Sequence, residues 1–232
     1  MNFTIFQLWT EQYRLLANLT WPNKTNYAER HGYKTIGVQH KVRSSIVLER
    51  ALQWAFTLDA MPDGDFLLMV GTDTIITRPD TRLEIFVDNN HDLFVLTDGY
   101  TVFGDALIVR SCPATRRFLF MVGERGHKYA KHVGSEQDAM TVILLDEPEI
   151  PKEEHSTAMI EAQLNKTDVR VKVLNDRKFC FDDIANHDSR GIPRLGQNRF
   201  FPRERTWMPE YFMVHLGGMP LTKRIELARN YL

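Results

Sequence analysis

Short apolar runs alternate with amphipathic stretches along most of the chain. Residues 3–8 form an apolar run rich in strand-forming residues, and residues 11–19 have the apolar spacing of a helix. The alternation continues with predicted strands at 34–39, 65–70, 92–96, 106–109 and 169–174 and with predicted helices at 44–58, 114–122 and 135–144. Strands that alternate with helices predict an α/β fold with a mainly parallel central sheet flanked by helices.

One apolar run ends in a carboxylate. Residues 66–70 are continuously apolar and are followed by Gly71, Thr72 and Asp73, after which the chain is apolar again. Ligands of open α/β sheets bind beyond the carboxyl ends of the strands, so functional residues are expected here. Burying an unpaired carboxylate is costly, and a Mg²⁺ or Mn²⁺ ion bridging Asp73 to a diphosphate would compensate its charge. A turn in which Asp73 accepts backbone N–H groups is the alternative that this segment leaves open.

Composition sets the expected size and electrostatics. The chain has 232 residues, 43% of them hydrophobic, which predicts one domain over 1–232. Its residues 146–207, which begin with an acidic and proline-containing stretch, are expected to form a variable surface excursion. Lys and Arg number 29 against 30 Asp and Glu, so the net charge gives no general attraction to a polyanion. No stretch approaches the roughly 20 apolar residues of a membrane span, and we expect a cytoplasmic protein.

Several short motifs carry a resemblance to a known family. Residues 23–33 read NKTNYAERHGY, residues 71–73 read GTD, residues 135–140 read SEQDAM and residues 211–218 read YFMVHLGG. In this order, over residues 3–232, they resemble the galactosyl-, mannosyl- and xylosyltransferases that share the GT-A nucleotide-diphospho-sugar transferase fold. The resemblance implies a glycosyltransferase that takes a nucleotide-diphosphate donor, with a UDP-sugar favoured, and a hydroxyl acceptor. It also implies retention of the anomeric configuration.

The resemblance further implies a Mn²⁺ or Mg²⁺ ion bound by Asp73 and His215. The family carries an Asp-x-Asp motif where this chain has Gly71, Thr72 and Asp73, so Asp73 is the carboxylate carried over. The family often has a lysine shortly after the histidine to neutralise the diphosphate. That place is Pro220 here, and the nearest bases, at positions 223 and 224, either substitute for the lysine or cover a solvated helix face.

The remaining candidate residues also follow from the resemblance. Those expected to bind the donor are Asn23, Lys24, Thr72, Asp73, Arg110, Gly217, Gly218 and Lys223. Those expected beside the transferred sugar, as catalytic residues, are Asp98, Asp105, Glu136, Gln137 and Asp138. Phe103 and Asp105 stand where the family has Asn and Gly, and these changes imply a different sugar or acceptor. For Asp98 a turn, and for Asp138 a helix cap with Ser135, are the structural alternatives.

A basic and aromatic segment at residues 189–207 bears on the identity of the acceptor. The candidate acceptor residues in it are Arg194, Arg199, Phe200, Arg203 and Trp207. Guanidinium groups among aromatic rings are typical of surfaces that follow phosphates and stack on bases. One hypothesis is therefore a hydroxymethylated pyrimidine in DNA, as in viral base-modifying glycosyltransferases, with the host cytoplasm as the location. A loop over the donor diphosphate, a bacterial surface-glycan precursor as acceptor, and a non-catalytic nucleotide-sugar-binding module are the alternatives.

Overall fold

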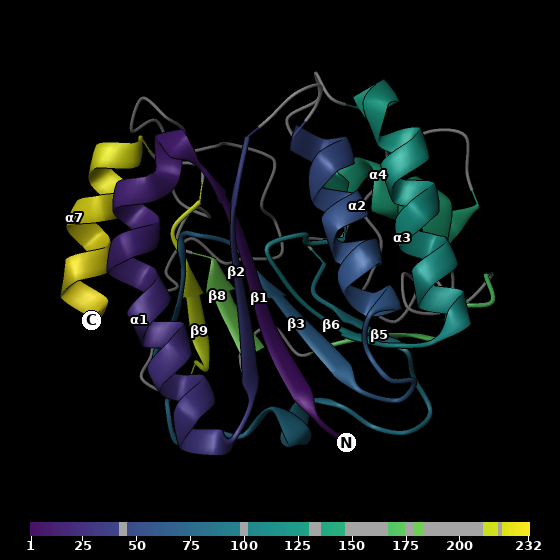
Figure 1. Cartoon of the computed structure of the whole chain (residues 1–232), viewed down its shortest axis with the longest axis horizontal. Coiled ribbons are helices and arrows are strands. Elements are labelled where there is room, and N and C mark those ends of the chain that lie inside the picture. The colour runs from purple at the N-terminus through teal and green to yellow at the C-terminus, as the bar shows by residue number, and fades with distance from the viewer. Residues whose placement is uncertain are drawn as a thin grey trace.

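A mostly parallel sheet runs through the middle of the protein (Figure 1). The computed structural model describes residues 1–41, 46–97, 102–129, 136–146, 167–174, 179–182, 211–217 and 220–232. Within these ranges the sheet has six strands, in the order β2 (Lys34–His40), β1 (Phe3–Thr10), β3 (Phe66–Val70), β6 (Ala106–Arg110), β5 (Leu93–Val95) and β7 (Val171–Val173). Each neighbouring pair is parallel except the two that involve β6, which runs antiparallel to β3 and β5. The expected α/β fold with a mainly parallel sheet is confirmed.

A second, smaller sheet was not expected from the apolar pattern. Its described strands are β4 (Thr74–Ile76), β9 (Met213–His215) and β8 (Cys180–Asp182), with β9 in the centre. Strand β4 has only three residues and begins directly after Asp73, so it does not stand out from the preceding run. It pairs antiparallel with β9 in a register that sets Thr74 opposite His215. The late part of the chain is thereby fixed beside the end of β3.

Helices cover both faces of the large sheet. Helices α2 (Ile46–Asp59), α3 (Pro113–Gly126) and α4 (Glu136–Leu145) pack on the face that carries Phe6, Leu67 and Met69. Helix α1 (Arg14–His31) packs on the opposite face, against Phe3 and Ile5, and α7 (Leu221–Tyr231) lies beside α1 (Figure 1). Single 3-10 turns cover Glu11–Tyr13, Leu83–Phe86 and His127–Tyr129. Alternate residues of β1 thus enter two separate cores, as the period of a strand requires.

Helix α1 is longer than its apolar spacing predicts. It continues through Pro22 to His31 and ends at Gly32, whose positive φ of 70° is the left-handed conformation that glycine adopts readily. Two polar residues, Thr20 and Lys24, lie on its buried side and are completely shielded from solvent. Because they interrupt the apolar stripe, the amphipathic pattern ends early while the helix does not.

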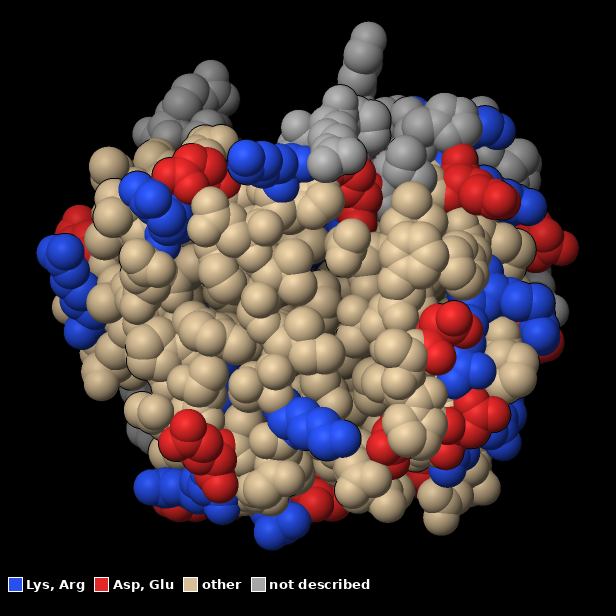
Figure 2. All heavy atoms as spheres, in the orientation of Figure 1, with Lys and Arg blue, Asp and Glu red and all other residues tan. Residues whose placement is uncertain are grey.

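The surface seen in the orientation of Figure 1 is mixed in charge. Figure 2 shows Lys and Arg interspersed with Asp and Glu around the rim, while the centre of this face is mostly uncharged. Among the described residues, no helix is both long enough and apolar enough to cross a membrane.

Candidate active site

Asp73 lies in the loop that joins β3 to β4 and is buried, with 7% of its surface exposed. Its Oδ1 atom is 3.5 Å from Nε2 of His215, and its Oδ2 accepts a 2.5 Å hydrogen bond from Nη1 of Arg224 on α7. The backbone N–H of Leu216 donates to the Asp73 carbonyl at 2.9 Å. Pairing of β4 with β9 therefore brings together the two residues expected to bind the cation.

Asp105 is the second carboxylate at this place. It comes just before β6, and its Oδ2 atom is 3.5 Å from the same Nε2 of His215. Its Oδ1 accepts a 2.5 Å hydrogen bond from Nη2 of Arg50 on α2. The His215 imidazole thus lies between two carboxylates, each of which is held from its other side by an arginine.

Arg50 links the cluster to the start of α4, and sequence reasoning missed it. Its guanidinium donates to Glu136 and to the Gly104 carbonyl, the latter at 3.3 Å, and lies 4.7 Å above the ring of Trp54. Burial would lower the pKa of Arg50, but the charges of Asp105 and Glu136 outweigh burial and raise it, so Arg50 stays protonated. The sequence did contain a signal for Arg50. It stands four residues before Trp54, so the two side chains lie on the same face of α2, and its charge interrupts the apolar residues of that face.

The charges around Asp73 keep it ionised. Burial would raise the pKa of this carboxyl, but the charge and hydrogen bond of His215 and the charge of Arg224 hold it well below its usual range. Lys24 on α1 is also within the electrostatic reach of Asp73 and is completely buried. Burial lowers the pKa of Lys24 to about 7, against the attraction of Asp73. Among the described residues its Nζ atom has no hydrogen-bond partner.

Two other residues expected to bind the donor support the backbone around the loop. Asn23 donates to the carbonyl of Ile76 and accepts from its N–H, both at 2.9 Å, and so holds the end of β4 against α1. Thr72 donates its hydroxyl to the Leu8 carbonyl at 3.1 Å. Lys223, in contrast, is exposed and pairs with Glu226 at 2.8 Å, so on α7 it is Arg224 that points to Asp73.

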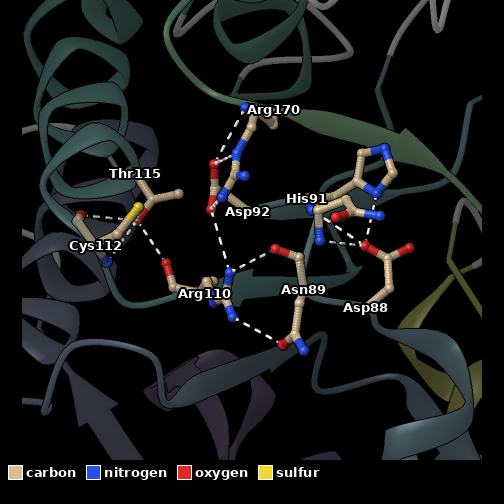
Figure 3. Close-up of polar contacts among 9 residues, drawn as sticks. Asp88, Asn89, His91, Asp92, Arg110, Cys112, Thr115 and Arg170 are labelled. Atoms are coloured by element: carbon tan, nitrogen blue, oxygen red, sulfur yellow. Dashed lines mark hydrogen bonds and ion pairs between the residues drawn. The ribbon is translucent and has the colours of Figure 1, made fainter.

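The structure places Arg110 far from Asp73. Arg110 lies opposite Phe66 at the beginning of β3, whereas Asp73 follows the end of β3. Four residues at about 3.3 Å each put roughly 13 Å of strand between the two ends. Arg110 donates to the backbone and side-chain oxygens of Asn89, both at 3.1 Å, and lies 3.9 Å from Asp92. Arg170 also holds Asp92, on the side away from Asn89 (Figure 3).

The start of α4 lies on the other side of Arg50. Glu136 and Asp138 are buried, and Glu136 accepts from Arg50. Gln137 packs against Gly104, where an added Cβ would lie 3.1 Å from the Gln137 Cγ. Phe103 meets the His215 ring edge-on, with centroids 4.9 Å apart, and Gly217 is buried just after β9. The remaining candidates lie outside the described residues: Asp98, Gly218, Arg194, Arg199, Phe200, Arg203 and Trp207.

The described residues do not form a complete protein cage for a metal. No group of three or more His, Cys, Asp and Glu side chains among them has the arrangement needed to hold an ion alone. Mg²⁺ and Mn²⁺ commonly take one or two carboxylates and complete their shell with substrate phosphates and water. Asp73 Oδ1 and His215 Nε2, which are adjacent and offer an oxygen and a nitrogen, fit such a partial site.

Comparison with known proteins gives structural neighbours. No family model matches the sequence, and no curated protein matches it. A glycosyltransferase involved in glycosylation of the major capsid of PBCV-1 superposes with a TM-score of 0.68 at 13% identity, over 99% of this chain and 100% of that one. The apo form of the glycosyltransferase GlyE from Streptococcus pneumoniae TIGR4 gives 0.58 at 11% identity. That match covers all of this chain and 60% of GlyE.

A third neighbour is the galactosyltransferase LgtC, solved with donor and acceptor sugar analogues. It gives a TM-score of 0.50 at 15% identity, over 98% of this chain and 95% of that one. All three neighbours are glycosyltransferases, and each match spans nearly the whole of this chain. The fold expected from the sequence is thereby confirmed: the chain has the GT-A glycosyltransferase fold.

Proposed function

We propose that the protein is a glycosyltransferase that transfers a sugar from a nucleotide diphosphate, with a UDP-sugar favoured, to a hydroxyl acceptor. The observation that carries the proposal is the contact between Asp73 and His215 at the carboxyl end of β3, in a chain with the GT-A fold. The carboxyl ends of parallel strands are where ligands of open α/β sheets bind. The match to the PBCV-1 enzyme over both full lengths supports a single domain over 1–232.

A Mn²⁺ or Mg²⁺ ion held by Asp73 and His215 would neutralise the diphosphate as it leaves the sugar. The protein itself supplies further positive charge at this place. Arg224 is directed at Asp73 from α7, and its guanidinium is shaped to donate two hydrogen bonds to a phosphate. We assign Arg224 the role of the lysine that position 220 lacks, because stabilising the leaving group is the largest electrostatic demand of the reaction.

The transferred sugar is proposed to lie toward the start of α4. Glu136 and Asp138 place carboxylates there, and a carboxylate stabilises the positive charge that develops on the sugar ring as the bond to phosphate breaks. Gln137 would bind sugar hydroxyls. Retention of the anomeric configuration belongs to the proposal through the family resemblance.

The acceptor is proposed from the basic and aromatic segment at residues 189–207. A hydroxymethylated pyrimidine in DNA is the specific hypothesis, carried by the arginine and aromatic segment that lies outside the described residues. The PBCV-1 neighbour acts in glycosylation of a capsid protein, so a capsid glycan is the alternative acceptor to include in a test. A non-catalytic nucleotide-sugar-binding module is a second candidate function, favoured by the arginines that already neutralise Asp73 and Asp105.

The test is release of UDP from a panel of UDP-sugars by the full chain, with and without Mn²⁺ and with each acceptor. We expect Mn²⁺-dependent release that Asp73→Asn and His215→Ala both abolish, while Asp88→Asn, a carboxylate paired with Lys172 near the opposite end of the sheet, retains it. Full turnover by both site variants would refute the proposal. Donor binding without turnover by the unaltered protein would favour the non-catalytic module.

A further inference from the structure

Strand β2 forms one edge of the large sheet. All seven of its residues, from Lys34 to His40, pair with β1 in one continuous register, and among the described residues β2 has no strand on its other side. Most of its residues are exposed, including Ile36, 36% of whose surface is accessible. An exposed edge strand presents a row of backbone N–H and C=O groups that can pair with another strand.

The features that usually protect an edge strand are weak in β2. Proteins commonly guard an exposed edge with proline, with a bulge or with charged side chains, lysine above all. The register with β1 is continuous, so no bulge interrupts β2, and its sequence KTIGVQH contains no proline and one lysine, at the first position. Gly37, at the centre, has no side chain and is exposed, so the backbone is accessible there. This edge is suited to pair with a further strand.

The surface around β2 also favours contact with a protein. Strand β2 lies between α1 and α2 in Figure 1, and Figure 2 shows that the centre of this face carries mostly uncharged residues. Aromatic rings pack against Gly37, since a Cβ added there would lie 2.9 Å from the ring of Trp21 and 3.1 Å from that of Trp9. Because the edge is backed by this packing, it needs little rearrangement to accept another strand.

We propose that β2 is the surface through which two copies of this chain associate, by antiparallel pairing of their β2 strands. The pairing joins the two large sheets across a twofold axis, as β-strand addition does in other proteins. An axis at Gly37 brings all seven residues into register over roughly 23 Å. It sets Ile36 opposite Val38 of the second copy, and this pair of β-branched side chains occurs twice in the interface.

The charges at the two ends of β2 favour a second copy as the partner and favour the antiparallel direction. Lys34 is exposed at the beginning of the strand. Two carboxylates lie at the other end, where Glu49 of α2 is bound to His40 and Glu11 accepts a 2.7 Å hydrogen bond from Gln39. Antiparallel pairing places Lys34 of each copy toward the carboxylates of the other, whereas parallel pairing places the two lysines together.

Sedimentation equilibrium of the full chain between about 1 and 100 μM tests the association. We expect a monomer–dimer equilibrium in which the dimer has twice the mass of one chain. Ile36→Lys adds a charge to the middle of the edge and should weaken the dimer about tenfold or more. Asn230→Lys, which adds the same charge at an exposed position of α7, on the far side of α1 from β2, is the control and should leave the dimer unchanged (Figure 1).

Reversing the charges tests the direction of pairing. Lys34→Glu directs a carboxylate toward Glu11 and Glu49 of the second copy, so it should weaken the dimer about tenfold. Adding Glu11→Lys, at an exposed side chain, should recover part of this loss. A double variant that binds no more tightly than Lys34→Glu alone would overturn the antiparallel arrangement.

The inference and the proposed function fail separately. An unaltered protein that stays monomeric over the whole concentration range would overturn the inference, whether β2 is covered by another segment or left open. A dimer that Ile36→Lys leaves intact would also overturn it, because the interface would lie elsewhere. Release of UDP by the same samples reports the proposed function on its own, since no residue of β2 is assigned to the candidate site. A monomer with full turnover leaves that function standing.

Discussion

Replacing Lys24 with methionine tests the electrostatics beneath Asp73. Lys24 lies on the buried side of α1, with none of its surface exposed and no hydrogen-bond partner for Nζ among the described residues. Its ammonium group is therefore removed from water with little compensation beyond the attraction of Asp73. Methionine has a similar length and no charge, so it retains the packing and removes the desolvation cost.

The size of the effect follows from the pKa of Lys24. Burial lowers it from the ordinary lysine value of 10.5 to about 7. Between these values the unfolded chain binds more protons than the folded protein, so stability rises with pH across this window. Below pH 7 both states are protonated and the full cost of about 5 kcal/mol applies, at 1.36 kcal/mol for each pKa unit. At pH 9 about 2 kcal/mol of this cost remains.

The assay is urea unfolding at pH 7 and pH 9. We expect Lys24→Met to raise the free energy of unfolding by about 4 kcal/mol at pH 7 and by about 2 kcal/mol at pH 9. Lys34→Met, which alters an exposed lysine on β2, is the control and should change little at either pH. A loss of stability in Lys24→Met, or a gain that does not depend on pH, would contradict this prediction. It would show that the folded protein compensates the buried ammonium group of Lys24 for the water that it loses.

Two further predictions concern opposite ends of the sheet. Arg224→Met should raise the KM for the donor about ten- to a hundredfold, since a charge-assisted hydrogen bond to the diphosphate contributes about 1.5–3 kcal/mol. Steady-state kinetics measure this KM, and an unchanged value would show that Arg224 does not bind the donor. Asp92→Asn should lower the free energy of unfolding by about 1–3 kcal/mol, because the bonds of the buried Asp92 carboxylate to Arg170 are weakened. The same variant should leave Mn²⁺ affinity intact, and a loss of Mn²⁺ binding would contradict the separation of the two ends.

The direction of one strand explains why some candidate residues lie at the site and others do not. In a sheet of parallel strands, residues just after each apolar run share one edge, and this rule correctly placed Asp73 after β3. Strand β6 runs antiparallel to β3, so the rule is reversed for it. Arg110, at the end of β6, lies at the far edge, while Asp105, before its start, lies beside Asp73.

The sequence by itself determined the order of the six strands of the large sheet and of helices α1 to α4, the fold class and the position of Asp73 after β3, because the period of apolar residues reports which face of each segment is buried. It placed His215 by resemblance to a family. The apolar spacing could not extend α1 to His31, since Thr20 and Lys24 are polar residues on the buried side of that helix. Where a helix buries polar side chains, the sequence has no apolar residues at those positions to mark the buried face.

Only the tertiary structure decided which charged groups meet. Asp73, Asp105 and Arg224 come from a loop, a strand start and a terminal helix, and their distances depend on the β3–β6 register and the β4–β9 pairing. Arg50 joins them because α2 lies over the same end of the sheet. Register and strand direction are set by packing between segments that are distant along the chain. They cannot be read from the local alternation of apolar and polar residues.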